Sequence, residues 1–206
     1  MFITFEGGEG TGKSTQVKLL AERFRAEGKT VLTTREPGGT PDAEAIRNLM
    51  VLGDPGRWSA NEELLLAFTA RNSHIRHVIE PTLKTGGIVV CDRFVDSSYV
   101  YQVVAGGADK SLFSALQAAV SNTSIPNFTF ILDVDHMVGS ERAHQRMLVG
   151  NGPAENRFER KGATFHEKVR AGFVEIAKYQ PARCHLIDAA ASELEVADRI
   201  WAKLHA

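Results

Sequence analysis

The most constraining feature of the chain is a glycine-rich segment near its start, Gly7-Gly8-Glu9-Gly10-Thr11-Gly12-Lys13-Ser14. It matches the pattern G-x-x-x-x-G-K-[ST], in which backbone N–H groups surround phosphate oxygens, the lysine reaches the β- and γ-phosphates and the hydroxyl ligates Mg²⁺. A β-prone run, Phe2 to Glu6, precedes the segment, and a helical pattern starts near Lys13. The sequence therefore predicts a nucleotide-binding P-loop. The residues assigned to ATP are Gly7, Gly8, Glu9, Gly10, Thr11, Gly12, Lys13, Ser14 and Thr15.

Strand-like and helical segments alternate along the rest of the chain. The strands are expected at Phe2–Glu6, Thr30–Thr34, Ile88–Asp92, Phe128–Val134 and Cys184–Ile187. Beyond the helix that follows the P-loop, helices are expected at Ala43–Leu52, Glu62–Thr82, Ser111–Ser121, Met137–Leu148, Phe165–Ala177 and Ser192–Leu204. This order predicts an α/β fold of the P-loop NTPase type, with a parallel five-stranded sheet covered by helices on both faces. Residues 1–206 are expected to form a single domain.

Composition excludes several classes of protein. The chain is 43% hydrophobic and 24% charged with a net charge of −1, which argues against a broad electrostatic grip on nucleic acid. No run approaches the length of a membrane span, so no membrane partner is expected and the cytoplasm is predicted. Cys91 and Cys184 are too few for a disulfide framework and are predicted to be reduced core residues.

Asp92 and Arg93 follow the strand expected at Ile88–Asp92, whose carboxyl end faces the same crevice as the P-loop. Asp92 is predicted to join Ser14 at the Mg²⁺ ion, and Arg93 to lie between donor and acceptor phosphates.

A basic, glycine-rich stretch at about 149–162 predicts a mobile flap over the site. Arg142 and Arg146 lie four residues apart on one helix face before it, and Arg157 lies within it. Closure of the flap would bring guanidinium groups over the transferred phosphoryl group. Arg142 is therefore assigned both to ATP binding and to catalysis, and Arg157 to catalysis.

Four further segments resemble bacterial thymidylate kinases, and with the P-loop they cover almost the whole chain in the family's order. They are Thr34-Arg35-Glu36-Pro37-Gly38-Gly39-Thr40, Cys91-Asp92-Arg93-Phe94-Val95-Asp96-Ser97-Ser98, Tyr101-Gln102 and Phe165-His166-Glu167-Lys168-Val169-Arg170. The resemblance implies transfer of the γ-phosphoryl group of ATP to dTMP, giving dTDP and ADP, with Mg²⁺ as cofactor. It also implies a homodimer that uses the helix expected at Glu62–Thr82.

The resemblance assigns the acceptor site residue by residue. Arg35, Arg47 and Arg93 would hold the 5′-phosphate, and Glu9 the sugar 3′-hydroxyl. Tyr101 would lie near the sugar 2′ carbon, and Arg71, Ser98 and Gln102 would contact the thymine. The full acceptor set is Glu9, Arg35, Glu36, Pro37, Arg47, Phe68, Arg71, Arg93, Ser98, Tyr101 and Gln102. The Glu36-Pro37 bond is similar to a family turn that is often cis. Because the P-loop lacks an arginine, the chain resembles the subtype that supplies one from the flap.

Two positions depart from the family pattern at the base pocket. The thymine-stacking phenylalanine is replaced by Ala67, with Phe68 one residue later, and the glycine after Tyr101-Gln102 is replaced by Val103. A kinase for dUMP or a modified pyrimidine is therefore an alternative. A nucleoside kinase and a regulatory ATPase are further alternatives, but neither needs the second anionic site predicted from the three arginines. With dTMP no general base is needed, and Lys13, Arg93, Arg142 and Arg157 are the expected catalytic residues.

Overall fold

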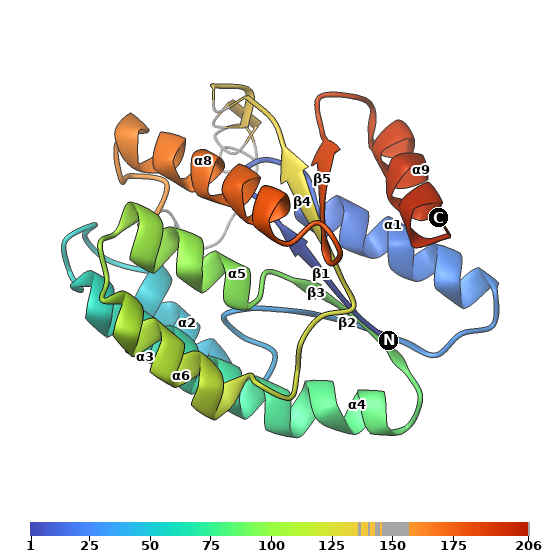
Figure 1. The fold of residues 1–206 in the computed structure, drawn as a ribbon, viewed down its shortest axis with the longest axis horizontal. Helices are drawn as coiled ribbons and strands as arrows, with labels where there is room; N and C mark the ends of the chain where they lie inside the picture. The colour runs from blue at the N-terminus through green and yellow to red at the C-terminus, as the bar shows by residue number, and fades with distance from the viewer. Residues whose placement is uncertain (136, 140, 143–144, 146–156, 206) are drawn as a thin grey trace.

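The computed structural model describes residues 1–135, 137–139, 141–142, 145 and 157–205. Figure 1 shows a twisted central sheet with helices on both of its faces. The strands are β1 (Phe2–Glu6), β2 (Val31–Arg35), β3 (Ile88–Asp92), β4 (Phe128–Asp133) and β5 (Cys184–Asp188). They are all parallel and lie in the order β2-β3-β1-β4-β5, which confirms the predicted five-stranded parallel sheet.

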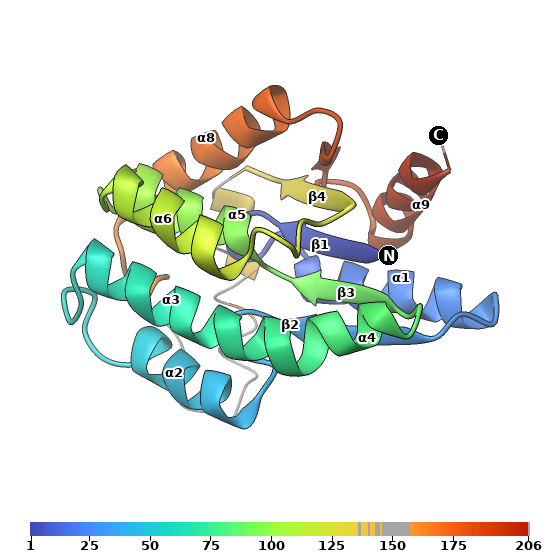
Figure 2. The ribbon, with the colours of Figure 1, turned by 60° about the horizontal axis from the view of Figure 1, so that its bottom comes forward.

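The helices divide between the two faces of the sheet. α1 and α9 cover one face, whereas α3, η2, α6 and α8 cover the other, and α2 packs against the outside of α3 (Figures 1 and 2). The bounds are α1 (Lys13–Ala26), α2 (Pro41–Val51), α3 (Ala60–His74), η1 (Ile75–Ile79), α4 (Glu80–Lys84), α5 (Val95–Ser98), η2 (Tyr99–Ala105), α6 (Lys110–Val120), α8 (Ala163–Tyr179) and α9 (Glu193–Leu204). Among the described residues, no helix combines the length and the apolar character needed to cross a bilayer.

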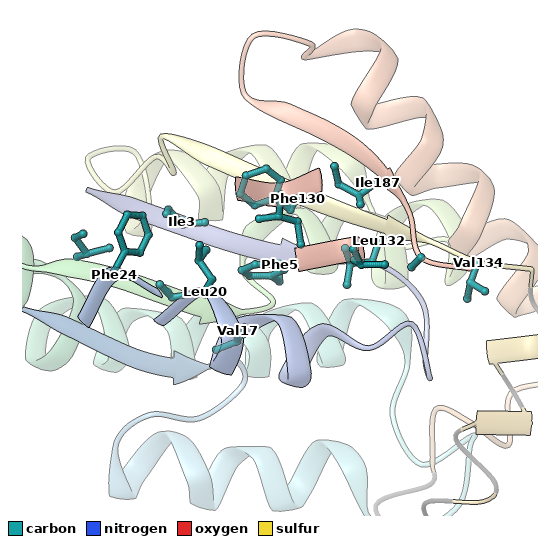
Figure 3. Packing of buried hydrophobic residues seen from close by; sticks show 14 residues of the cluster. Ile3, Phe5, Val17, Leu20, Phe24, Phe130, Leu132, Val134 and Ile187 are labelled. Atoms are coloured by element: carbon teal, nitrogen blue, oxygen red, sulfur yellow. The ribbon is translucent and has the colours of Figure 1, made fainter. Parts of the chain in front are cut away.

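Alternation along each strand builds a separate core on each face. Ile3 and Phe5 of β1 point to the face covered by α1 and α9, where they pack with Leu20 of α1 and Phe130 of β4 (Figure 3). Phe2 belongs to the opposite core, under α3 and α6. Full burial of one such side chain contributes about 1.5–3 kcal/mol. The two cores therefore hold β1 at the centre of the sheet, and the P-loop begins directly at its carboxyl end.

Most predicted elements agree with the structure to within two or three residues at their ends. The bounds of β1 and β3 are those predicted, and Ser192 caps α9 through a capping box with Glu195. The long helix expected at Glu62–Thr82 is present as α3, η1 and α4, with a π-helical segment in the middle. Much of the predicted helix Met137–Leu148 and the part 149–156 of the predicted flap lie outside the described residues.

Residues 95–105 form α5 and η2, although no helix is predicted there from the sequence. The stretch is rich in valine and tyrosine, which have modest helix propensity. Burial of Val100, Tyr101 and Gln102 against α3 and α8 outweighs that propensity. Cys91 and Cys184 are buried free thiols, as predicted.

Candidate active site

The P-loop is shaped by close approaches that only glycine allows. Gly7 and Gly10 have φ of +133° and +67°, and a Cβ would collide with the carbonyl oxygen of Leu132 at Gly7 and with that of Gly139 at Gly10. Gly12 ends the loop at φ 89°, and no side chain caps the first turn of α1. The N–H groups of that turn are therefore available to an anion, and the helix dipole favours one.

Lys13 is buried at the base of this loop. Its Nζ donates to the carbonyl oxygens of Gly8 and Gly7, at 2.6 and 3.2 Å. Burial, together with the nearby guanidinium of Arg93, lowers the pKa of Lys13 from 10.5 to about 8. A polyphosphate would supply further negative charge and favour the protonated amine.

Ser14 and Asp92 meet beside the P-loop, as the predicted metal site requires. The Ser14 hydroxyl donates to Oδ2 of Asp92 at 2.7 Å. Asp92 is the last residue of β3, next to β1 in the sheet, which explains how residues 78 positions apart in sequence come together. A hydroxyl and a carboxylate are the hard oxygen ligands that Mg²⁺ prefers.

Arg93 joins the P-loop to the neighbouring cavity. Its Nη1 donates to the carbonyl oxygen of Gly7 at 3.0 Å and to Ser97 Oγ at 3.2 Å, and its Nη2 donates to Glu9 Oε1 at 2.8 Å and to Tyr101 OH at 3.1 Å. Its φ is 69°, a left-handed conformation that costs a non-glycine residue about 1–2 kcal/mol. These four contacts hold the guanidinium at the boundary between the two predicted phosphate sites.

Glu6 supports the turn at Arg93, a role that was not predicted from the sequence. Its Oε1 accepts from the backbone N–H of Phe94 at 2.8 Å, and its Oε2 from the Ser97 hydroxyl at 2.5 Å. Burial and the nearby Asp96 raise the pKa of Glu6 to about 8. Glu6 therefore anchors the turn that carries Arg93. An acidic residue at the end of an otherwise apolar strand is the signal that could have revealed it.

A cavity of about 360 Å³ lies beside the P-loop and contains the predicted acceptor-phosphate arginines. Arg35, Arg47 and Arg93 line it together with Lys13 and Asp92. The structure thus brings both predicted anion sites into one cleft at the carboxyl ends of β1, β2 and β3.

A second cavity, of about 130 Å³, continues from Arg47 and Arg93 toward α3. Apart from Arg35 and Phe68, every predicted acceptor residue lines it: Glu9, Glu36, Pro37, Arg47, Arg71, Arg93, Ser98, Tyr101 and Gln102. Sequence analysis did not assign its other walls, which are Met50, Val51, Ala67, Phe94, Ser97, Phe158 and Glu159. We call this second cavity the base pocket.

Arg71 is a buried, hydrogen-bonded side chain of the base pocket. It is 2% exposed; its Nε donates to Glu36 at 2.8 Å and its Nη2 to Ser98 Oγ at 2.9 Å. Among the described residues, its buried Nη1 has no hydrogen-bond partner. A buried donor without a partner costs about 1–3 kcal/mol, which a ligand acceptor would recover. The carboxylate of Glu36 orients Arg71, and the peptide bond between Glu36 and Pro37 is cis, as expected.

Phe68 does not line the base pocket. Its ring is 1% exposed and lies edge-on to Phe113 in the core, and the guanidinium of Arg71 lies 4.6 Å from the centre of the ring. One residue along a helix turns a side chain by about 100°, so Ala67 faces the cavity in its place. These contacts do not support the predicted contact between Phe68 and a base, and they indicate that Phe68 supports Arg71.

The two described flap arginines lie in different places. Arg142 lines a cavity with Gly12 and Thr15 of the P-loop segment, and its Nη1 donates to the carbonyl oxygen of Ala189 at 3.2 Å. This position agrees with its predicted role at ATP. Arg157 is fully buried, ion-paired with Glu63 at 2.6 Å, and lines neither of the two acceptor cavities. Its contacts do not support the predicted place over the phosphoryl group. Arg146 lies outside the described residues.

Comparison with known proteins agrees with this geometry. Residues 5–200 match the sequence profile of the family described as thymidylate kinase. The chain is 52% identical to the thymidylate kinase of Caulobacter vibrioides, covering 91% of this chain and 88% of that protein. It is 47% identical to that of Afipia carboxidovorans, covering 97% and 86%. The crystal structure of thymidylate kinase from Ehrlichia chaffeensis superposes with a TM-score of 0.79 at 36% identity, covering 99% of this chain and 98% of that one. The chain therefore belongs to the thymidylate kinase family.

Proposed function

We propose that the protein transfers the γ-phosphoryl group of ATP to dTMP, giving dTDP and ADP. The observation that carries the proposal is the position of Arg93, which donates to the P-loop carbonyl of Gly7 and also lines the base pocket. One side chain therefore contacts both halves of the cleft, as phosphoryl transfer between two bound nucleotides requires. The relatives named thymidylate kinase support the same reaction.

The chemistry is proposed to rest on positioning and on charge neutralisation. The acceptor phosphate oxygen is already anionic near neutral pH, so no general base is needed. Lys13 and Arg93 would neutralise charge that develops on the transferred group, and Arg142 would add a cation from the ATP side. Arg35 and Arg47 would hold the acceptor phosphate in line with the donor.

Mg²⁺ is the proposed cofactor, held by Ser14 and Asp92. In nucleotide enzymes this ion is usually bound by one or two carboxylates together with substrate phosphates, rather than by a complete protein cage. Ser14 and Asp92 agree with that pattern, because they bring one hydroxyl and one carboxylate together beside the P-loop. When bound with ATP, the ion would offset charge on the donor phosphates.

For the acceptor nucleoside, Glu9 is proposed to bind the sugar 3′-hydroxyl and Tyr101 to lie beside the 2′ carbon. Tyr101 OH donates to Glu9 Oε1 at 3.1 Å, so the two groups face the same part of the base pocket. Arg71, Ser98 and Gln102 are proposed to contact the base. Arg71 supports this assignment most strongly, since it lines the cavity and has a buried donor with no partner among the described residues.

The reaction is tested by measuring ADP production with ATP and Mg²⁺ against a panel of nucleoside monophosphates and nucleosides. We expect turnover with dTMP and, at lower kcat/KM, with dUMP. Comparable turnover of dAMP or dGMP would contradict a pyrimidine acceptor. Turnover of nucleosides alone would contradict an acceptor phosphate.

We further propose that residues 1–206 act as one kinase domain in the cytoplasm, and that two chains form a homodimer. A single sheet from β1 to β5 supports the one-domain assignment. Leu65 of α3 and Leu49 of α2 are 46% and 40% exposed, and a partner chain would cover such side chains. Light scattering of the purified protein would reject the dimer if it gave the mass of one chain.

A further inference from the structure

Glu63 of α3 is a buried carboxylate that the reaction described above does not use. Its side chain is 1% exposed, and both of its oxygens accept hydrogen bonds. Oε1 accepts from Arg157 Nη2 at 2.6 Å and from Lys161 Nζ at 2.7 Å. Oε2 accepts from the side-chain amide of Gln102 at 3.0 Å. Glu63 therefore connects Arg157 and Lys161 with Gln102, a residue of the base pocket.

The two cations hold the carboxylate in place. Arg157 also donates to the carbonyl oxygens of Met50, Asp54 and Pro55, at 3.0, 2.9 and 2.9 Å, so its guanidinium cannot turn without breaking several bonds. Lys161 approaches the same Oε1 from a partly exposed position. These bonds hold Glu63 at its Oε1 and thereby fix the position of its Oε2 next to Gln102.

A carboxylate only accepts hydrogen bonds, and this determines the orientation of the neighbouring amide. Gln102 must direct its Nε2 donor toward Glu63, because its Oε1 would be repelled there. The other terminal atom of this amide is then its carbonyl oxygen. Gln102 is 3% exposed and lines the base pocket together with Arg71 and Ser98. Glu63 itself does not line that pocket, so it acts through Gln102.

We infer that Glu63 is a specificity-determining positioning residue, which makes Gln102 present an acceptor to the base. This inference rests on the proposed pyrimidine acceptor. Thymine and uracil carry an N3–H donor, whereas N3 of cytosine is an acceptor and would face the Gln102 oxygen unpaired. Glu63 therefore disfavours dCMP without contacting it.

The test compares kcat/KM for dTMP and for dCMP in the wild type, in Glu63→Gln and in Glu63→Asp. In Glu63→Gln the new amide can donate to Gln102, so the amide of Gln102 can flip. We therefore expect the ratio of kcat/KM for dTMP to kcat/KM for dCMP to fall by about 10- to 100-fold. Aspartate keeps the charge that Arg157 and Lys161 need but withdraws the carboxylate from Gln102, and the ratio should fall here too. Partial unfolding would lower both values equally and leave the ratio unchanged.

Glu62→Gln is the matched control, because it removes the same charge from the adjacent, exposed residue of α3. Its ratio should equal that of the wild type. A ratio within about threefold of the wild type in folded Glu63→Gln would overturn the inference. If that variant does not fold, Glu63→Asp decides by the same criterion. A wild type that does not phosphorylate dTMP would instead overturn the proposed function.

Discussion

Replacing Arg93 by lysine is expected to lower kcat about 10³-fold, with little change in the affinity for ATP. The guanidinium reaches Gly7, Ser97, Glu9 and Tyr101 at once, through donors on both of its terminal nitrogens. A lysine ammonium is a point charge on a flexible stem and cannot span this set. The substitution should therefore weaken the stabilisation of the transferred phosphoryl group and leave the binding of ATP by the P-loop largely unchanged.

Steady-state kinetics at saturating ATP and dTMP measure this loss directly, and fluorescence titration gives the Kd for ATP. Arg76→Lys is the matched control, since Arg76 is exposed on η1 outside the site. A loss of less than about tenfold in kcat would contradict a transition-state role for Arg93. An equal loss in ATP affinity would make Arg93 a ground-state binding residue instead.

Truncating Arg71 is expected to affect base binding and stability together. Arg71→Ala removes the Nη1 donor that has no partner in the described part of the chain, and it should raise the KM for dTMP about 100-fold, with KM for ATP unchanged. It also leaves Glu36, which is 3% exposed, without its guanidinium partner. Breaking a buried ion pair in this way costs about 3–5 kcal/mol, which should appear as a clear drop in Tm.

A double variant separates the two effects. Arg71→Ala with Glu36→Gln replaces the unpaired carboxylate by a neutral amide that can still hydrogen-bond His74. We expect it to recover much of the lost Tm but none of the lost dTMP affinity. A KM for dTMP close to that of the wild type in either variant would refute base recognition by Arg71.

The sequence predicted the sheet, and the positions in it of the residues assigned to phosphate, for a physical reason. Buried parallel strands are short, continuous apolar runs, and the bounds of β1 and β3 follow directly from such runs. The P-loop is equally local, since its glycines, Lys13 and Ser14 are consecutive. Asp92 and Arg93 were placed correctly because the carboxyl ends of parallel strands share one edge of the sheet.

What the sequence could not predict depends on distant partners. Glu6 and Ser97 are 91 positions apart, and Glu63 and Arg157 are 94 apart, so neither network appears in any local pattern. The residue of α3 that lines the base pocket could not be predicted for a different reason. On α3 a shift of one position decides whether Phe68 or Ala67 faces the cavity, and only the packing of Phe68 on Phe113 settles this.

The contact between Gly10 and Gly139 determines how closely the segment that carries Arg142 approaches the P-loop. Because neither residue has a side chain, the P-loop and the helical turn before Arg142 touch backbone to backbone. A Cβ on either glycine would meet the backbone of the other segment at less than 3.0 Å and push the two segments apart. The absence of these two side chains therefore sets how closely Arg142 approaches the P-loop.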